Sequence, residues 1–334
     1  MIKGFTYGWD ARRGMFKTEE SFESMKRLAE TGCNWVTLAF MVTQQTFSST
    51  RFGFDYRFCV TDREIILAVE RLKSLGMKVC LKPILNSEDG VWRAHISFPD
   101  IEFPVTDNSG NERHFHGKRN KYWDEWFSCY TAFICHYAEI AEDTNCEMLC
   151  LGCEMLGTEK KEDYWRLLID EVKNIYHGKT VYNTNHGSEN NVKWFDAVDF
   201  IGTSAYYPVA DGGGESAESM VKRWEKVKPQ LAAVSEKFGG KKIVFMEIGC
   251  RSARGCAAMP WDFNHVDLPY DEDEQNNFYL SALTAFWDEP WFGGFFWWDW
   301  GTNLYPIEKS RTDRGFAIYG KKAEKTLSEW YHSH

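Results

Sequence analysis

Long apolar runs are missing from this sequence of 334 residues, and none approaches the about 18 residues that a membrane-spanning helix requires. Positive charge is also scarce, because 39 lysines and arginines stand against 49 aspartates and glutamates and give a formal net charge of −10. Proteins that bind nucleic acid or anionic lipid gather lysine and arginine on one face. We therefore expect neither a nucleic acid nor a membrane as partner.

The ten cysteines do not have the setting of a disulfide framework. Several stand inside apolar runs, such as Val79-Cys80-Leu81, and resemble small buried hydrophobic residues. Cys146, Cys150 and Cys153 are poorly spaced for zinc, because strand residues of opposite parity face opposite sides and no second ligand pair is in range. We expect free thiols and no metal. The cysteines are Cys33, Cys59, Cys80, Cys129, Cys135, Cys146, Cys150, Cys153, Cys250 and Cys256.

The start of the chain, Met1-Ile2-Lys3-Gly4-Phe5, lacks the charged, apolar and small-residue progression of a signal peptide. Many free thiols suit a reducing compartment. We therefore expect a cytoplasmic protein, with secretion after removal of a leader as the alternative.

Short apolar runs alternate with longer amphipathic segments from end to end, which is typical of βα units around a parallel sheet. Runs such as 242–246 are apolar at both parities, as expected when helices cover the outside and neighbouring strands fill the inside. We predict one (β/α)8 TIM barrel over residues 1–334, since these barrels often exceed about 250 residues. A doubly wound open sheet is the alternative, but residues 4–8 lack the spacing of a phosphate loop.

The expected strands are 2–8, 34–41, 78–85, 147–153, 180–185, 199–206, 242–248 and 293–299. The expected helices are 18–31, 61–75, 122–143, 161–176, 190–196, 216–238, 272–288 and 321–332.

Two expected connections, 86–121 and 249–270, are much longer than the about 2 to 6 residues typical of βα loops. Both follow the C-terminal ends of strands, the face on which barrel enzymes build their sites. Their aromatic and histidine residues predict cleft walls, and surface insertions that pack on themselves are the alternative. These residues are Trp92, His95, Phe98, Phe103, His114, Phe115 and His116 in the first connection and Trp261 and His265 in the second.

Two carboxylates close apolar strands, Glu154 after residues 147–153 and Glu247 after residues 243–246. They stand 93 positions apart, which at about 31 residues per βα unit places them on the fourth and seventh strands. Two carboxyl groups facing each other across a barrel mouth at about 5 to 5.5 Å are the arrangement of a retaining glycosidase. One must stay protonated and the other ionised. The alternative is that each glutamate forms a buried salt bridge with a lysine or arginine.

Four expected strands end in the segments Leu151-Gly152-Cys153-Glu154, Ser204-Ala205-Tyr206-Tyr207-Pro208, Phe245-Met246-Glu247-Ile248-Gly249 and Gly294-Phe295-Phe296-Trp297-Trp298-Asp299-Trp300. These segments resemble glycoside hydrolase family 113, and the likeness extends over nearly the whole chain. The resemblance implies a clan A retaining hydrolase, in which the acid/base ends the fourth strand and the nucleophile ends the seventh, and hence Glu154 and Glu247. Characterised members are mainly β-1,4-mannanases. The resemblance thus implies a retaining endo-β-1,4-mannanase that acts on mannan or manno-oligosaccharides without a cofactor.

The residue before the acid/base departs from the clan pattern. Most members have an asparagine there, which hydrogen-bonds the sugar 2-hydroxyl, whereas this chain has Cys153, a weak donor. Asn86, at the end of the third expected strand, is a candidate for that contact. Mannose carries an axial 2-hydroxyl, so the departure fits a mannan substrate.

Further substrate-binding candidates lie at the ends of other expected strands. Tyr206 is expected to hydrogen-bond the nucleophile, as a tyrosine does in this clan. Either Trp297 or Trp298 is a candidate platform under the reacting sugar, although parity sends one of them outward. Lys82 shares the parity of Asn86 and is expected to face the mouth. The remaining candidates are Trp9, as a subsite wall, and His186, as either a sugar contact or a satisfied polar strand end.

Other functions stay open at this point. A β-mannosidase or a β-glucanase of the same clan would share both glutamates, and a closed pocket would favour exo action over endo action. A catalytically dead carbohydrate-binding barrel would not need both glutamates. An aldolase or isomerase barrel would need a Schiff-base lysine or a phosphate loop near the last strands, where Gly293-Gly294 is followed by aromatics instead. We expect a monomer.

Overall fold

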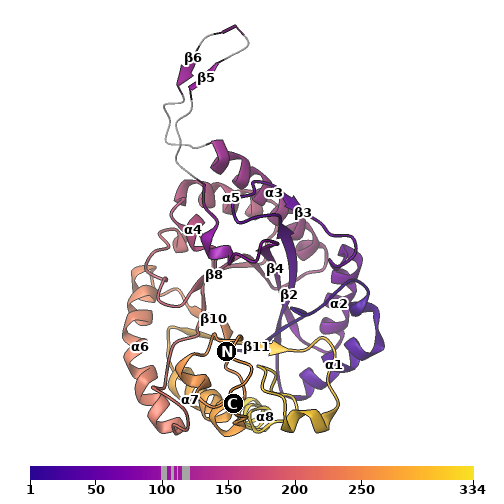
Figure 1. The fold of residues 1–334 in the computed structure, drawn as a ribbon, viewed down its shortest axis with the longest axis vertical. Helices are drawn as coiled ribbons and strands as arrows, with labels where there is room; N and C mark the ends of the chain where they lie inside the picture. The colour runs from indigo at the N-terminus through magenta and orange to yellow at the C-terminus, as the bar shows by residue number, and fades with distance from the viewer. Residues whose placement is uncertain (99–103, 107–108, 111, 115–120) are drawn as a thin grey trace.

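A ring of eight parallel strands forms the centre of the computed structural model, which describes residues 1–98, 104–106, 109–110, 112–114 and 121–334 (Figure 1). The first strand pairs with both the second and the last, so the sheet closes on itself and the predicted (β/α)8 barrel is confirmed. Around the ring the strands are β1 (Ile2–Tyr7), β2 (Trp35–Gln44), β4 (Lys78–Ser87), β7 (Met148–Cys153), β8 (Lys179–Asn185), β9 (Phe200–Ser204), β10 (Ile243–Ile248) and β11 (Phe292–Trp300).

Among the described residues, three short strands lie outside this ring. Strand β3 (Phe52–Gly53) pairs antiparallel with the end of β2. Strands β5 (Pro104–Thr106) and β6 (Glu112–His114) form a separate two-stranded sheet.

Helices surround the barrel and cover the outer faces of its strands (Figure 1). Their starts follow local signals, as at α2, where Thr61 and Glu64 form a reciprocal capping box. The buried stripe of each helix packs on the strands, which leaves the polar stripe in solvent. The described helices are α1 (Glu19–Glu30), α2 (Asp62–Ser74), α3 (Lys121–Asp143), α4 (Leu156–Glu159), α5 (Glu162–Ile175), α6 (Ala217–Lys237), α7 (Glu272–Phe286) and α8 (Lys322–Ser333).

The helix expected at 190–196 is wrong. The chain between β8 and β9 forms turns and one short 3-10 helix, η3 (Phe195–Ala197). The segment Gly187-Ser188-Glu189-Asn190-Asn191 consists mostly of residues that favour turns. Trp194 is fully buried and stacks on Trp165 of α5 at 4.6 Å between ring centroids, so aromatic side chains cover β8 where a helix would otherwise lie.

The longest connections all follow the C-terminal ends of barrel strands. The two predicted from the sequence, after β4 and after β10, are present at 88–120 and 249–271. Two more, 45–61 after β2 and 301–321 after β11, were not singled out by sequence. Together these loops surround one mouth of the barrel, and the candidate catalytic residues lie at this mouth.

Within the described ranges, no helix has both the length and the apolar character needed to cross a bilayer.

Candidate active site

Glu154 directly follows β7 and has a left-handed backbone, with φ of 52°. Few residues other than glycine adopt this conformation, and it persists where the surroundings impose it. Here the Glu154 amide donates to the carbonyl oxygen of Asn183 on β8 at 2.7 Å. This hydrogen bond fixes the turn and therefore the direction of the side chain.

Glu154 is 7% exposed, and Oε2 of its carboxylate accepts two hydrogen bonds. Arg93 Nη2 donates at 2.8 Å and Trp92 Nε1 at 3.3 Å, both from the long loop after β4. Burial raises the pKa of Glu154, the Arg93 charge opposes this, and the negative charge of Glu247 adds to it. The resulting pKa lies above the ordinary value, which favours a protonated carboxyl.

Glu247, on β10, has three partners. Lys82 Nζ lies 2.6 Å from Oε1, the Tyr206 hydroxyl donates to Oε2 at 3.2 Å, and the Cys153 thiol lies 3.3 Å from Oε1. Burial alone would raise the pKa of Glu247, but the positive charges of Lys82 and Arg93 and the hydrogen bonds from Lys82 and Cys153 outweigh it and lower the pKa. The environment thus favours an ionised carboxylate.

Each glutamate does form the buried salt bridge that was the alternative to catalysis. The two bridges are not equivalent, because the pKa of Glu154 is raised and that of Glu247 is lowered. A pair of carboxyl groups whose environments separate their pKa values is the arrangement that acid and nucleophile require.

Cys153 lies between the two carboxylates. Its thiol is 3.3 Å from Glu247 Oε1 and 3.5 Å from Arg93 Nη2, which in turn contacts Glu154. Asn183 Nδ2 donates to the same sulfur at 3.1 Å. A continuous network of polar contacts at the mouth therefore connects Glu154 to Glu247.

Lys82 and Asn86 both face the mouth, as their parity predicted, but their side chains contact protein groups. Lys82 is fully buried against Glu247. The Asn86 oxygen accepts from Arg93 Nη1 at 2.8 Å, and its amide contacts Met41 Sδ at 3.1 Å. Asn86 is half-buried.

The two neighbouring tryptophans of β11 lie on opposite sides of the strand. Trp298 is partly exposed and packs against Trp9, 5.4 Å away between ring centroids. Trp297 is fully buried, stacks on Tyr279 of α7 at 4.1 Å and donates to the Tyr331 hydroxyl of α8 at 2.9 Å. The candidate role of Trp297 in sugar binding is therefore wrong, because its side chain lies between the strand and the helices.

His186 lies at the rim of the mouth beside the loop after β10. Trp261 of that loop stacks on the imidazole at 5.6 Å with an angle of 24° between the rings, and 44% of Trp261 is exposed. Burial lowers the pKa of His186, so the ring is neutral near pH 7. Together these rings form a stacked aromatic pair.

The remaining loop residues divide between the mouth and the core. Phe98 is buried against Trp123 of α3 and is not a cleft wall. His95 packs on Trp92, and His265 pairs with Asp262. Phe103, Phe115 and His116 lie outside the described residues, as does the side chain of His114.

Cavities lie on the face around the mouth. One, of about 390 Å³, lies beside the ends of β1, β2 and β4 and is lined by Arg12, Met41, Thr43, Arg57, Phe58 and Glu88 among others. Its volume falls in the range of ligand sites. Met41 joins this cavity to Asn86 and hence to the carboxylate network.

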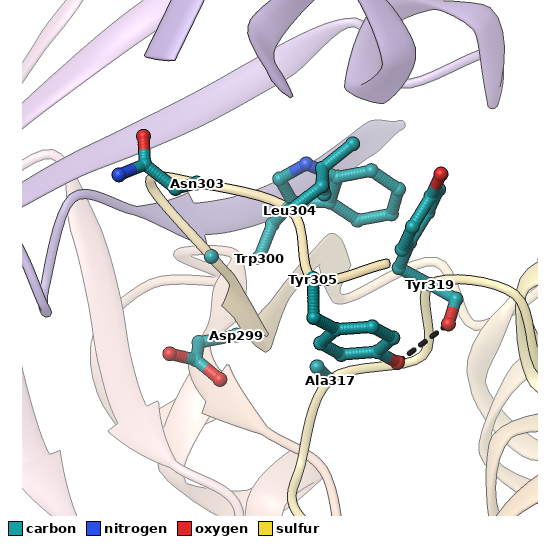
Figure 2. A pocket seen from close by; sticks show the side chains of 8 residues that line it. Asp299, Trp300, Asn303, Leu304, Tyr305, Ala317 and Tyr319 are labelled. Carbon is teal, nitrogen blue, oxygen red and sulfur yellow. Dashed lines mark hydrogen bonds between the residues drawn. The ribbon is translucent and has the colours of Figure 1, made fainter. Parts of the chain in front are cut away.

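Another cavity, at the end of β11, has a volume of about 20 Å³, enough for about one water molecule. In Figure 2 the Asp299 carboxylate points away from the aromatic rings, and the Tyr305 hydroxyl donates to the Tyr319 carbonyl at 2.6 Å. Burial and the negative charge of Asp10 raise the pKa of Asp299 to about 7. This cavity is too small to take a sugar.

Arg93, Asn183 and Ser204 also contact the two glutamates or Cys153 but were not predicted from the sequence as site residues. Arg93 lies on a 3-10 turn, η2 (Arg93–His95), and a search for polar residues that close strands cannot find a loop residue. Asn183 and Ser204 hydrogen-bond each other at 3.2 Å within neighbouring strands, and Ser204 also contacts the Glu154 carboxylate. The inward parity that selected Lys82 would have selected Asn183 as well.

No group of three or more His, Cys, Asp and Glu side chains in the described part of the chain is arranged to hold a metal ion.

Solved structures with related sequences share this architecture. The GH113 beta-mannanase AaManA from Alicyclobacillus acidocaldarius is 38% identical, with a TM-score of 0.86 and coverage of 99% of this chain and 97% of that chain. A structure described as a GH113 beta-1,4-mannanase is 37% identical, with a TM-score of 0.87 and coverage of 100% and 99%. A beta-glucuronidase from Ruminococcus gnavus, 11% identical with a TM-score of 0.60, covers 99% of this chain and 50% of that chain and shares the fold alone.

A search of curated proteins finds no match. The sequence model of glycoside hydrolase family 113, in contrast, matches residues 5–321. This match and the relatives at 37% and 38% identity agree with the two carboxylates at the barrel mouth. The chain therefore belongs to glycoside hydrolase family 113.

Proposed function

We propose that this chain is a retaining endo-β-1,4-mannanase that hydrolyses mannan or manno-oligosaccharides by double displacement. Glu247 is the nucleophile and Glu154 the acid/base. The substrate follows from family membership and from relatives described as β-1,4-mannanases. The observation that supports the mechanism is the unequal environment of the two carboxylates. It raises the pKa of Glu154 and lowers the pKa of Glu247.

In the first step a Glu247 oxygen forms a bond to the anomeric carbon while the bond from that carbon to the glycosidic oxygen breaks, and Glu154 gives its proton to the departing oxygen. In the second step Glu154 takes a proton from water, the water oxygen bonds to the anomeric carbon, and Glu247 leaves. Two displacements at one carbon restore its original configuration.

Lys82 and Tyr206 hold the nucleophile. Their contacts occupy both carboxylate oxygens of Glu247 and fix its orientation below the sugar. Trp298 and Trp9 supply apolar faces suited to the C–H face of the sugar in the reacting position. His186, Cys153 and Asn86 complete the proposed substrate-binding set. We also propose that the chain acts as a monomer, in the cytoplasm, with neither nucleic acid nor membrane as partner.

The test begins with the wild-type protein on mannohexaose. We expect mannobiose and mannotriose among the first products, with the new reducing end initially in the β-anomeric form by NMR. Release of mannose alone would instead indicate a β-mannosidase. An initial α-anomer would contradict retention.

The nucleophile is tested by Glu247→Ala with azide. Hydrolysis should fall by several orders of magnitude, and azide should restore turnover of an activated aryl mannoside as the α-mannosyl azide, because the small anion enters the vacated site. Hydrolysis at the wild-type rate would refute the assignment of Glu247.

A further inference from the structure

Arg93 is the one charged residue of the described loop after β4 that contacts the carboxylate network. Its guanidinium donates from Nη1 to Asn86 at 2.8 Å, from Nε to the Cys153 carbonyl at 2.9 Å and from Nη2 to Glu154 Oε2 at 2.8 Å. The side chain is 11% exposed. Three directed hydrogen bonds on a buried guanidinium fix its position relative to Glu154.

The loop that carries Arg93 is held close to the catalytic strand. A side chain at Gly157 of α4 would place its first carbon 2.0 Å from the Ile96 carbonyl oxygen, so the two backbones meet directly. Helix α4 begins two residues after Glu154. The turn η2 is thereby fixed to the segment that carries the acid.

A cation beside a general acid opposes the role of that acid. Arg93 favours the ionised form of Glu154, whereas protonation of the leaving oxygen needs the neutral form. In the free enzyme burial and the negative charge of Glu247 counteract Arg93. Once Glu247 is bonded to the sugar it carries no charge, and the effect of Arg93 on Glu154 is no longer opposed by that neighbour.

We propose that Arg93 is a positioning residue that converts Glu154 from acid to base between the two halves of the reaction. This inference rests on the proposed double displacement. In the glycosyl-enzyme Arg93 stabilises the carboxylate that must accept a proton from water. Arg93 and Trp92 both donate to Oε2 and leave Oε1 for the proton that Glu154 exchanges with substrate and water, and the Ser204 hydroxyl is a further group in contact with this carboxylate.

Other titratable groups also surround Glu154, and Arg93 must be distinguished from them. Lys82 and Cys153 lie on β4 and β7, Glu247 on β10 and Tyr206 after β9, and Glu159 is on α4. Of these, Lys82 is the cation, and it pairs directly with Glu247. Arg93 is therefore the positive charge in direct contact with Glu154 among the described residues.

The test compares Arg93→Met, Arg93→Lys and, as a matched control, Arg51→Met, which removes an exposed arginine that pairs with Glu125. In the pH profile of kcat/KM on a manno-oligosaccharide, the limb at high pH reports the pKa of the general acid in the free enzyme. Loss of the Arg93 charge should move this limb up by about 1 to 3 pH units. Arg93→Lys should keep the limb near the wild-type pH but lower kcat, and Arg51→Met should change neither.

A second readout isolates the base step. On a dinitrophenyl β-mannoside the first displacement needs no acid, so hydrolysis of the intermediate limits turnover. Arg93→Met should lower kcat by about 10²-fold at a pH below the shifted limb, and azide, which needs no base, should restore it.

An unshifted basic limb in Arg93→Met would overturn the proposal, and so would a failure of azide to restore turnover. If Arg93→Met does not fold, as judged by circular dichroism, Arg93→Lys decides the question, because an upward shift of its limb despite the retained charge overturns the proposal. Absence of retention in the wild-type protein would refute the proposed function instead.

Discussion

At the scale of single residues, the two catalytic candidates differ in the sum of charges around them. Both are buried carboxylates, and burial raises the pKa of each. Glu247 has Lys82 in contact and Arg93 nearby, whereas Glu154 has Arg93 in contact and the negative charge of Glu247 nearby. The division into acid and nucleophile therefore follows from which carboxylate the lysine contacts.

Replacing Lys82 by methionine tests this division. Without the cation at 2.6 Å the pKa of Glu247 should rise. Activity needs ionised Glu247, so the acidic limb of the kcat/KM profile should move up by about 1 to 3 pH units. The measurement is the pH profile on mannotetraose, and a movement of the basic limb alone would contradict the pairing.

Replacing Glu154 by alanine should affect substrates unequally. Natural manno-oligosaccharides need protonation of the leaving oxygen, so their hydrolysis should fall by about 10² to 10⁴. Dinitrophenolate leaves without a proton, so dinitrophenyl β-mannoside should still show a rapid burst of dinitrophenol, and azide should give the β-mannosyl azide. Equal losses on both substrates in steady-state and burst measurements would count against Glu154 as the acid.

At the scale of elements, side chains alternate along β11, so neighbouring residues of this strand serve either the stability of the fold or the binding of substrate. Trp297 packs between the strand and helices α7 and α8, whereas Trp298 faces the mouth. Trp297→Ala should lower the free energy of unfolding by about 3 to 5 kcal/mol. Trp298→Ala should cost about 1 kcal/mol or less but lower kcat/KM by about tenfold or more.

Thermal unfolding and kinetics of the two variants decide this prediction, and each variant is the control for the other. A large loss of stability in Trp298→Ala, or a stable Trp297→Ala protein with weakened substrate binding, would show that the two side chains are assigned to the wrong faces.

Periodicity and strand-end carboxylates were enough to predict the barrel and the positions of Glu154 and Glu247, because both depend on local alternation within strands. The prediction of a helix over 190–196 was wrong because turn-forming residues and the buried Trp194 outweighed a weak helical pattern. Arg93 reaches Glu154 across 61 positions of sequence from an irregular loop. Such a contact depends on how the loop packs on α4, so a local sequence pattern cannot predict it.

At the scale of the whole molecule, the ten cysteines lie in the chain as free thiols, most of them buried. The sulfurs of Cys250 and Cys256 lie 2.9 Å apart within the loop after β10. We propose that this pair stays reduced with the others in the cytoplasm. Protein purified under non-reducing conditions and then denatured should titrate close to ten thiols with a chromogenic disulfide reagent. A result of eight free thiols would indicate a disulfide, with Cys250 and Cys256 as the oxidised pair, and would argue for a secreted protein.

We expect a preference for mannan over glucan that depends on the whole mouth, and chiefly on what surrounds the sugar 2-hydroxyl. An amide donor before the acid/base suits an equatorial 2-hydroxyl, and this chain has Cys153 there, whose thiol is already in contact with Glu247, Arg93 and Asn183. The half-buried amide of Asn86 lies near the end of β4 instead, where its Nδ2 contacts Met41 Sδ. A good transition-state hydrogen bond to the 2-hydroxyl contributes several kcal/mol.

Misplacing that hydrogen bond should therefore cost about two to three orders of magnitude in rate. We expect kcat/KM on mannopentaose to exceed that on cellopentaose by at least about 10²-fold under one set of conditions. Cys153→Asn, which restores an amide at this position, should narrow the ratio, with Cys153→Ala as the control that removes the thiol without adding a donor. Preference of the wild-type protein for the glucan would refute the proposed specificity, and an equal change of the ratio in both variants would show that the missing amide is not its cause.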